Sequence, residues 1–498
     1  MTSPSATDVS AAPAAAPRRR FSVGGLFARW EWAALGGILV LYLVVVALSV
    51  RRGPPLGWDE SVYSLRARDF ATGTEPVSYW DAYRAPGLPW VLHFLWGLGS
   101  HPTVFRLAVA AFMLGLVVVT WLLTRHLFGR GPALVAAAGV SLSPPLLLAA
   151  TQVWPDVPGA ALGLLAIALF VIATGGDRPS WWMAALVPVV AAATFVRYGA
   201  PLPMAVGLLA VAGWRWRVWW RRPLPVIVTA LAAAAVVVTI LAVPQLSGAQ
   251  SSPLRAITGY NRSWLDGFAG FASMGEQAVG PAAVVLALAG VVAGFGWAKR
   301  EGIDRSALVV AGVVCVVTVV GLATVLHGEL RYLAPAYPWL WVAGAPGLER
   351  LGRALPRRAQ PVLAAVVVLA LAVAGVGTAR ERNRAGSSDH GSVRQAATEI
   401  AAQAGGRRCL VVVQRVPQVM WYSGCKAIPF DLDEIALDEI ALPRPPRTVT
   451  FLMWVGGDER QPTGDLLAAY RAAAGELILS LEDRRPVEVY LVHEPRRG

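Results

Sequence analysis

Two neighbouring acids, Asp59 and Glu60, and a tyrosine three residues later, Tyr63, are the residues most suited to chemistry in this sequence. They belong to the stretch GWDESVYSLRARDF, which runs from Gly57 to Phe70. A carboxylate can accept a proton within hydrogen-bond reach, and it can also pair with a cation. Acids are common in solvated loops as well, so the role of these two depends on which residues lie around them and on which side of a membrane they lie.

Further acids, arginines and tyrosines occur in other segments that connect apolar runs. They form the short motifs YRAP, PDVPG, RYG, NRSW and ELRY. The candidates in these motifs are Arg84, Asp156, Arg197, Arg262, Arg331 and Tyr332.

The elements around these residues are predicted membrane spans. Of the 498 residues, 56% are hydrophobic and 15% are charged, and the mean hydropathy is +0.53. A soluble domain rarely carries so little charge, and long apolar runs recur along the chain. The sequence therefore predicts an α-helical polytopic membrane protein. The expected spans are 33–50, 104–124, 132–150, 156–174, 181–197, 199–213, 224–243, 281–298, 307–326, 332–349 and 361–379.

The net charge of +13 does not indicate a nucleic-acid partner, because the basic residues form short clusters between apolar runs. One cluster precedes the first span, and the others follow even-numbered spans, which is the positive-inside pattern. The pattern predicts a multi-pass protein of the plasma membrane with a disordered cytoplasmic tail over 1–32. The segment 51–103 and the C-terminus then face outward, as do all the candidate residues above.

The charge distribution separates two classes of function. Ion-coupled transporters carry ionisable residues inside their spans, near the midplane of the bilayer. Here the middles of the spans are mostly Ala, Val and Leu, and the acids and arginines lie at one boundary of the membrane. This distribution favours an enzyme that acts on a lipid head group. The alternative is a flippase for lipid-linked sugars, or another transporter or binding protein without catalysis.

A composition change after Thr378 predicts a second domain. The membrane domain is expected over 33–379, a polar linker over 380–390 and a small extracytoplasmic α/β domain over 391–498. Cys409 and Cys425 both fall in this last part. An outward-facing compartment permits a disulfide between them, although two free thiols would have the same spacing.

The ordered motifs resemble the GT-C integral-membrane glycosyltransferases. WDESVY, YRAPGLPWVLHFLWGLG, the PD before the fourth span, RYG and ELRYLAPAYPWLWV follow one another over about the first 350 residues. The resemblance is to the branch with protein O-mannosyltransferases and the bacterial lipid A aminoarabinose transferase, which is similar to glycosyltransferase family 39. Each motif is weak alone, and the order on one face of the membrane carries the resemblance.

The resemblance implies transfer of a sugar from an outward-facing polyprenyl phosphate to a hydroxyl of a protein, cell-wall glycan or glycolipid. It implies an inverting reaction with Asp59 as the general base, while Glu60 orients the acceptor or fixes a neighbouring arginine. No cofactor is expected, and a divalent cation stays open. The expected phosphate- or substrate-binding residues are Arg84 and Arg331 first, then Arg197, Arg262, Tyr63, Tyr332 and Asp156.

Structural roles compete with each of these assignments. Asp59 and Glu60 could cap the helix that starts beside them, because acids favour helix N-termini. Asp156 could do the same for the fourth span. The arginines could anchor spans at the level of the head groups, and Glu329 could be no more than the ion-pair partner of Arg331.

Overall fold

The computed structural model describes eleven stretches of the chain. They are residues 29–50, 53–73, 84–99, 102–175, 181–216, 223–246, 281–301, 304–325, 329–430, 448–457 and, with gaps, 464–492, and the single residue Ala269 is described besides them. Of the expected tail over 1–32, only its last four residues fall within these ranges, and they are helical.

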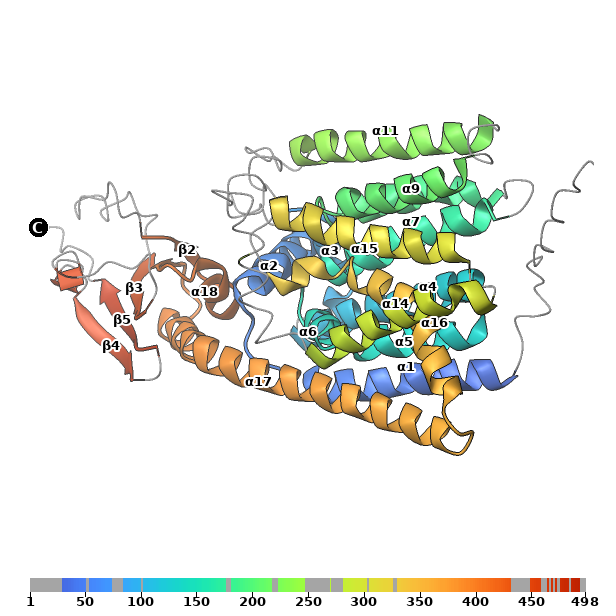
Figure 1. Ribbon diagram of the computed structural model, residues 1–498. Coiled ribbons are helices and arrows are strands. Elements are labelled where there is room, and N and C mark those ends of the chain that lie inside the picture. Colours follow the sequence, from blue (N-terminus) through green and yellow to red (C-terminus); the bar gives the residue numbers. More distant parts are fainter. Residues whose placement is uncertain are drawn as a thin grey trace, which may run out of the picture.

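A bundle of apolar helices makes up most of the molecule (Figure 1). Its helices are α1 (Arg29–Val50), α4 (Pro102–Phe128), α5 (Arg130–Leu142), α6 (Pro144–Ala150), α7 (Asp156–Ala173), α8 (Leu186–Val196), α9 (Pro201–Trp214), α11 (Pro223–Leu246), α14 (Pro281–Glu301), α15 (Arg305–Val325), α16 (Tyr337–Ala354) and α17 (Ala359–Ala404). A helix lies at each of the eleven expected spans.

The helices differ in whether they are long enough to cross a membrane. Among the described residues, six helices are sufficiently long and apolar, and a seventh span results if α5 and α6 count as one. These two helices meet at a bend of 58°. The bend follows from Pro144 and Pro145, because proline lacks an N–H group and disfavours a helical conformation in the residue before it. The chain is therefore a multi-pass membrane protein.

Two shorter helices lie at one end of the bundle, on the side of the C-terminal sheet (Figure 1). Helix α2 spans Trp58–Thr72 and contains Asp59 and Glu60 in its first turn. Helix α3 spans Gly87–His93 and is followed by the 3₁₀ helix η3, Trp96–Leu98.

The expected linker over 380–390 is helical instead, since α17 continues without a break for 46 residues. The segment is polar, but it contains no proline, and contacts with other elements hold it. The Asn383 side-chain amide donates to the Ser49 carbonyl at 3.0 Å, and a side chain at Gly386 would meet Pro54. The two expected domains are thus joined by a continuous helix.

The C-terminal domain, residues 391–492 as described, packs a five-stranded sheet against the end of α17. Its further elements are β1 (Cys409–Val412), α18 (Val416–Ser423), β2 (Lys426–Ile428), β3 (Val449–Val455), β4 (Glu476–Leu481) and β5 (Val487–Val492). The strand order is β2-β1-β3-β5-β4. Strand β1 is parallel to both of its neighbours, and β5 is antiparallel to both of its own. The predicted α/β architecture is confirmed.

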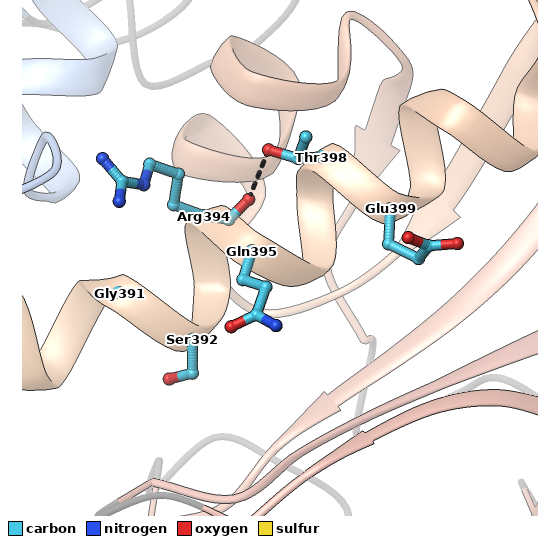
Figure 2. A pocket seen from close by; sticks show the side chains of 6 residues that line it. All are labelled: Gly391, Ser392, Arg394, Gln395, Thr398 and Glu399. Atoms are coloured by element: carbon cyan, nitrogen blue, oxygen red, sulfur yellow. Dashed lines mark hydrogen bonds between the residues drawn. The ribbon is translucent and has the colours of Figure 1, made fainter.

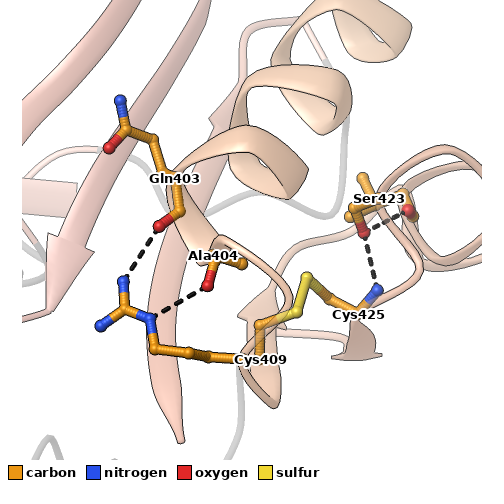
Figure 3. Close-up of a disulfide and its surroundings, with 7 residues drawn as sticks. Gln403, Ala404, Cys409, Ser423 and Cys425 are labelled. Carbon is orange, nitrogen blue, oxygen red and sulfur yellow. Dashed lines mark hydrogen bonds between the residues drawn. A yellow bond between two sulfur atoms is a disulfide. The ribbon is translucent and has the colours of Figure 1, made fainter.

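A disulfide joins Cys409 to Cys425, the pair considered from the sequence (Figure 3). Cys409 begins β1, and Cys425 follows the C-terminal end of α18. The bond therefore ties the end of this helix to the sheet.

Candidate active site

Glu60 is the anchor of α2 within the molecule. Both of its oxygens accept from the Arg106 guanidinium at 2.9 Å. The backbone N–H of Val153 donates to it at 2.9 Å, and that of Gly57 donates at 3.2 Å. The Glu60 side chain is only 4% exposed. These contacts fit the expectation that Glu60 fixes a neighbouring arginine, and the Gly57 contact caps the helix.

Sequence reasoning did not single out Arg106. The residue lies within the first turns of α4 and is buried. A charged residue inside a predicted span is expensive unless it has a partner, and this cost was the signal available in the sequence. The partner itself is 46 positions away, in α2.

Asp59, the next residue, makes an entirely different set of contacts. Its two oxygens pair with Arg84 at 2.5 Å and with Arg331 at 2.6 Å. Burial alone would raise the pKa of the Asp59 carboxyl, but Arg331 and Arg84 lower it, and the net shift is downward. Asp59 is therefore ionised at neutral pH, and its side chain keeps 22% of its surface exposed.

Arg331 reaches the site from η5 (Leu330–Leu333), which precedes α16. Besides Asp59, it pairs with Glu329 at 2.5 Å and lies 4.5 Å from the centre of the Trp154 ring. It also donates to the Tyr332 hydroxyl at 3.3 Å. Burial alone would lower the pKa of Arg331, but Asp59 leads the groups that raise it, so the guanidinium stays charged.

A second ion pair, between Asp156 and Arg197, adjoins the first. Asp156 opens α7 and Arg197 follows the end of α8, so each charge lies at the helix end whose dipole favours it. The Arg197 guanidinium is 5.3 Å from the centre of the Tyr332 ring. Tyr332 thereby connects this pair to Arg331.

Tyr63 and Arg84 complete the cluster. The Arg84 guanidinium is 5.9 Å from the centre of the Tyr63 ring, and burial raises the pKa of Tyr63 to about 12. The Arg66 side chain donates to the Arg84 carbonyl at 2.8 Å and holds the chain there. All the candidates in the described residues except Glu60 thus meet in one cluster, whereas Arg262 lies outside those residues.

Among the residues that the structure describes, the ion pairs of this cluster join three carboxylates to three arginines. Asp59, Asp156 and Glu329 oppose Arg84, Arg197 and Arg331. A phosphate that enters must therefore compete with a carboxylate for a guanidinium group. In the part of the chain that the structure describes, no three His, Cys, Asp or Glu residues form a group that could hold a metal ion.

A separate polar hollow of about 600 Å³ lies along the C-terminal part of α17 (Figure 2). Its lining residues are Gly391, Ser392, Arg394, Gln395, Thr398 and Glu399. They offer hydrogen-bonding groups, and Thr398 donates to the Arg394 carbonyl at 2.8 Å. None of the candidate residues within the described ranges lines this hollow.

Comparison with known proteins agrees with the fold expected from the sequence. Residues 83–242 match the family model described as dolichyl-phosphate-mannose-protein mannosyltransferase, which is less than half of the chain. No curated protein sequence matches the chain.

Solved structures match over most of its length, and they are GT-C glycosyltransferases. ArnT from Cupriavidus metallidurans bound to undecaprenyl phosphate matches with a TM-score of 0.62 and 18% identity, over 93% of this chain and 98% of that one. The oligosaccharyltransferase AglB from the archaeon Archaeoglobus fulgidus matches with a TM-score of 0.51 and 12% identity, over 80% of this chain and 64% of that one.

The arabinofuranosyltransferase AftD from Mycobacteria matches with a TM-score of 0.51 and 16% identity, over 94% of this chain and 40% of that one. At these identities the likeness defines the fold. The chain has the GT-C fold of integral-membrane glycosyltransferases, and that prediction is confirmed.

Proposed function

We propose that the protein is a membrane glycosyltransferase that moves a sugar from an outward-facing polyprenyl phosphate to a hydroxyl group of an extracytoplasmic acceptor. The observation that carries the proposal is the carboxylate of Asp59 held between Arg84 and Arg331. The family match over 83–242 and the similarity to ArnT bound to undecaprenyl phosphate support the same class of donor.

In the proposed reaction, the acceptor oxygen attacks the anomeric carbon of the sugar. The bond between that carbon and the phosphate oxygen breaks, its electron pair stays on the polyprenyl phosphate, and the anomeric configuration inverts. The acceptor proton passes to the Asp59 carboxylate, which acts as general base. Arg84 and Arg331 stabilise the negative charge that grows on the leaving phosphate.

Because each arginine of the cluster already pairs with a carboxylate, the reaction steps follow an order in which donor binding comes first. The donor phosphate exchanges with Asp59 as the partner of a guanidinium group, and this exchange turns the carboxylate toward the acceptor. Asp59 has a lowered pKa while both arginines hold it. Its basicity therefore rises when the phosphate takes over one of these contacts.

The test is a transfer assay with purified protein, radiolabelled polyprenyl-phosphate sugars and an envelope fraction. Wild-type protein should transfer label to the acceptor fraction. Asp59→Asn preserves size and capping ability but removes the base, so we expect a loss of about a hundredfold or more.

Asp304→Asn is the matched control. Asp304 accepts from the backbone N–H of Ser306 at 2.9 Å, at the start of α15, and asparagine caps a helix about as well as aspartate. Its transfer rate should equal that of wild type. A wild-type transfer rate in Asp59→Asn would show that Asp59 is not the general base. Movement of labelled lipid across the membrane of vesicles, without sugar transfer, would favour a flippase.

A further inference from the structure

The C-terminal domain packs directly on helix α2, which carries Asp59. Figure 1 shows α18 next to α2, and the two helices are in contact. Leu65 of α2 belongs to the hydrophobic core of the domain, and Trp58 packs against that core. One apolar interface thus joins α2 to a domain that begins more than 300 residues later in the sequence.

A hydrogen bond from the C-terminal domain holds the residue before the start of α2. The backbone N–H of Leu56 donates to the Tyr422 hydroxyl of α18 at 2.7 Å. Leu56 is fully buried and directly precedes the N-cap residue Gly57. A buried N–H group without a partner is costly, so Tyr422 helps to fix where the chain enters the helix.

Trp421, which precedes Tyr422 in α18, contacts two further elements of the membrane bundle. The Trp421 ring lies edge-on to Trp96 of η3, with centres 6.1 Å apart. Its centre is 6.3 Å from that of Phe105 in α4. Phe105 adjoins Arg106, the partner of Glu60. Helix α18 therefore meets both sides of the ion pair that anchors α2.

Helix α18 is itself held at its end by the sheet (Figure 3). The disulfide joins Cys425 to Cys409 at the start of β1. The backbone N–H of Cys425 donates to the Ser423 hydroxyl at 3.1 Å. Gly424, between them, has the left-handed φ of 72° that glycine adopts without strain. Tyr422 thus projects from a helix end with a covalently fixed position.

We infer that the C-terminal domain positions Asp59, with Tyr422 as the positioning residue. The inference rests on the proposed function of Asp59. Leu56 lies three residues before Asp59, so a displacement at Leu56 moves Asp59. Arg84 is tied to α2 by the hydrogen bond from Arg66, whereas Arg331 comes from the separate element η5. The hydroxyl of Tyr422 therefore controls the geometry in which the Asp59 carboxylate meets Arg331.

The test replaces Tyr422 by phenylalanine, which keeps the ring packing and removes only the hydroxyl. We expect kcat to fall by about tenfold to a hundredfold with the KM for the donor unchanged, because small misplacements of reacting groups cost this much. The matched control is Tyr490→Phe in the same domain, whose hydroxyl contacts Glu488 at 2.5 Å. Its kcat should equal that of wild type.

Hydrogen exchange at the Leu56 amide is a second measurement, and it does not require transfer activity. Exchange should accelerate about tenfold or more in Tyr422→Phe, because the amide loses its acceptor. It should be unchanged in Tyr490→Phe.

Each result decides one question. Wild-type kcat in Tyr422→Phe overturns the inference, as do unchanged exchange at Leu56 and an equal fall of kcat in both variants. If wild-type protein transfers no sugar while exchange at Leu56 responds only to Tyr422→Phe, the proposed function fails but the contact that holds α2 stands.

Discussion

At the scale of single residues, the two arginine contacts of Asp59 govern its charge. Arg84 and Arg331 approach different oxygens of the carboxylate. Such charge-assisted hydrogen bonds stabilise the ionised form, so the carboxylate is held in place and deprotonated before any substrate binds. Predictions about pH and about the arginines follow from this arrangement.

The lowered pKa of Asp59 predicts the acid side of the pH–rate profile. Burial alone would raise the pKa above the usual 3.8, but Arg331 and Arg84 bring it below that value. The stability from these ion pairs is thus present above pH 3.8 and is lost as the pH falls through the folded-state pKa. Because kcat/KM reports the free enzyme, we expect no loss of kcat/KM through protonation of Asp59 between about pH 7 and about pH 5.

The pH profile of kcat/KM for wild type and for Asp59→Glu checks this prediction. An acidic limb near about pH 6 that shifts in Asp59→Glu would contradict it, because such a limb would require a raised pKa at residue 59.

Replacement of Arg331 by lysine keeps the positive charge and removes the planar fork. Arg331 contacts Asp59, Glu329 and the face of Trp154 at once, and an ammonium group cannot reproduce this geometry. We expect the transfer rate to fall by about tenfold in Arg331→Lys and by about a hundredfold in Arg331→Ala. Equal amounts of folded protein are compared in the transfer assay.

Arg353→Lys is the control for this prediction. Arg353 is a largely exposed arginine near the end of α16 that pairs with Glu349, away from the cluster. It should transfer at the wild-type rate. If both Arg331 variants also matched wild type, Arg331 would have no part in the reaction.

At the scale of elements, Glu60 and Arg106 hold three parts of the chain together. The pair joins α2 to α4, and the Val153 N–H adds the segment before α7. Because both partners are buried, removal of one leaves the other charged and uncompensated. The adjacent acids of α2 therefore have separate tasks, since Glu60 secures the helix and Asp59 faces the arginines.

Glu60→Gln should accordingly lower stability. Loss of one partner of a buried ion pair costs about 3–5 kcal/mol, which thermal unfolding of the purified protein would register as a clear fall in Tm. Glu399→Gln makes the same change in α17, where the side chain accepts a hydrogen bond from the exposed Gln403, and its Tm should not change. An unchanged Tm with a hundredfold slower transfer would instead give Glu60 a chemical role.

At the scale of the whole molecule, helix α2, which carries Asp59, and the C-terminal domain lie at the same end of the bundle (Figure 1). The domain contacts α2 through α18, and α17 connects it to the bundle. The cluster and the domain must therefore face the same compartment. The positive-inside pattern predicts that this compartment is outside the cell membrane.

Single cysteines test this orientation. We expect Thr398→Cys, on an exposed position of α17 in the C-terminal domain, to react with a membrane-impermeant maleimide in intact cells. Ser306→Cys, exposed near the start of α15, should react only after lysis. The reverse pattern would invert the topology and with it the proposed outward-facing donor.

Much of the fold could be predicted from the sequence, because it depends on local composition. Apolar runs long enough to cross a bilayer identify helices whatever their neighbours are. The change after Thr378 and the short β-rich runs indicated the C-terminal α/β domain. The grouping of Asp59 with Arg84, Arg197 and Arg331 followed from one-sided topology and from family resemblance.

Only the tertiary structure decided which charge meets which. The distance in sequence between Glu60 and Arg106, or between Asp59 and Arg331, carries no signal in a single chain. The partners are set by how helices from distant segments pack. The same holds for the helical segment 380–390, whose polar composition indicated a linker. In that segment, the contacts of Asn383 and Gly386 with the bundle outweigh the weak local preference of the sequence for an irregular linker.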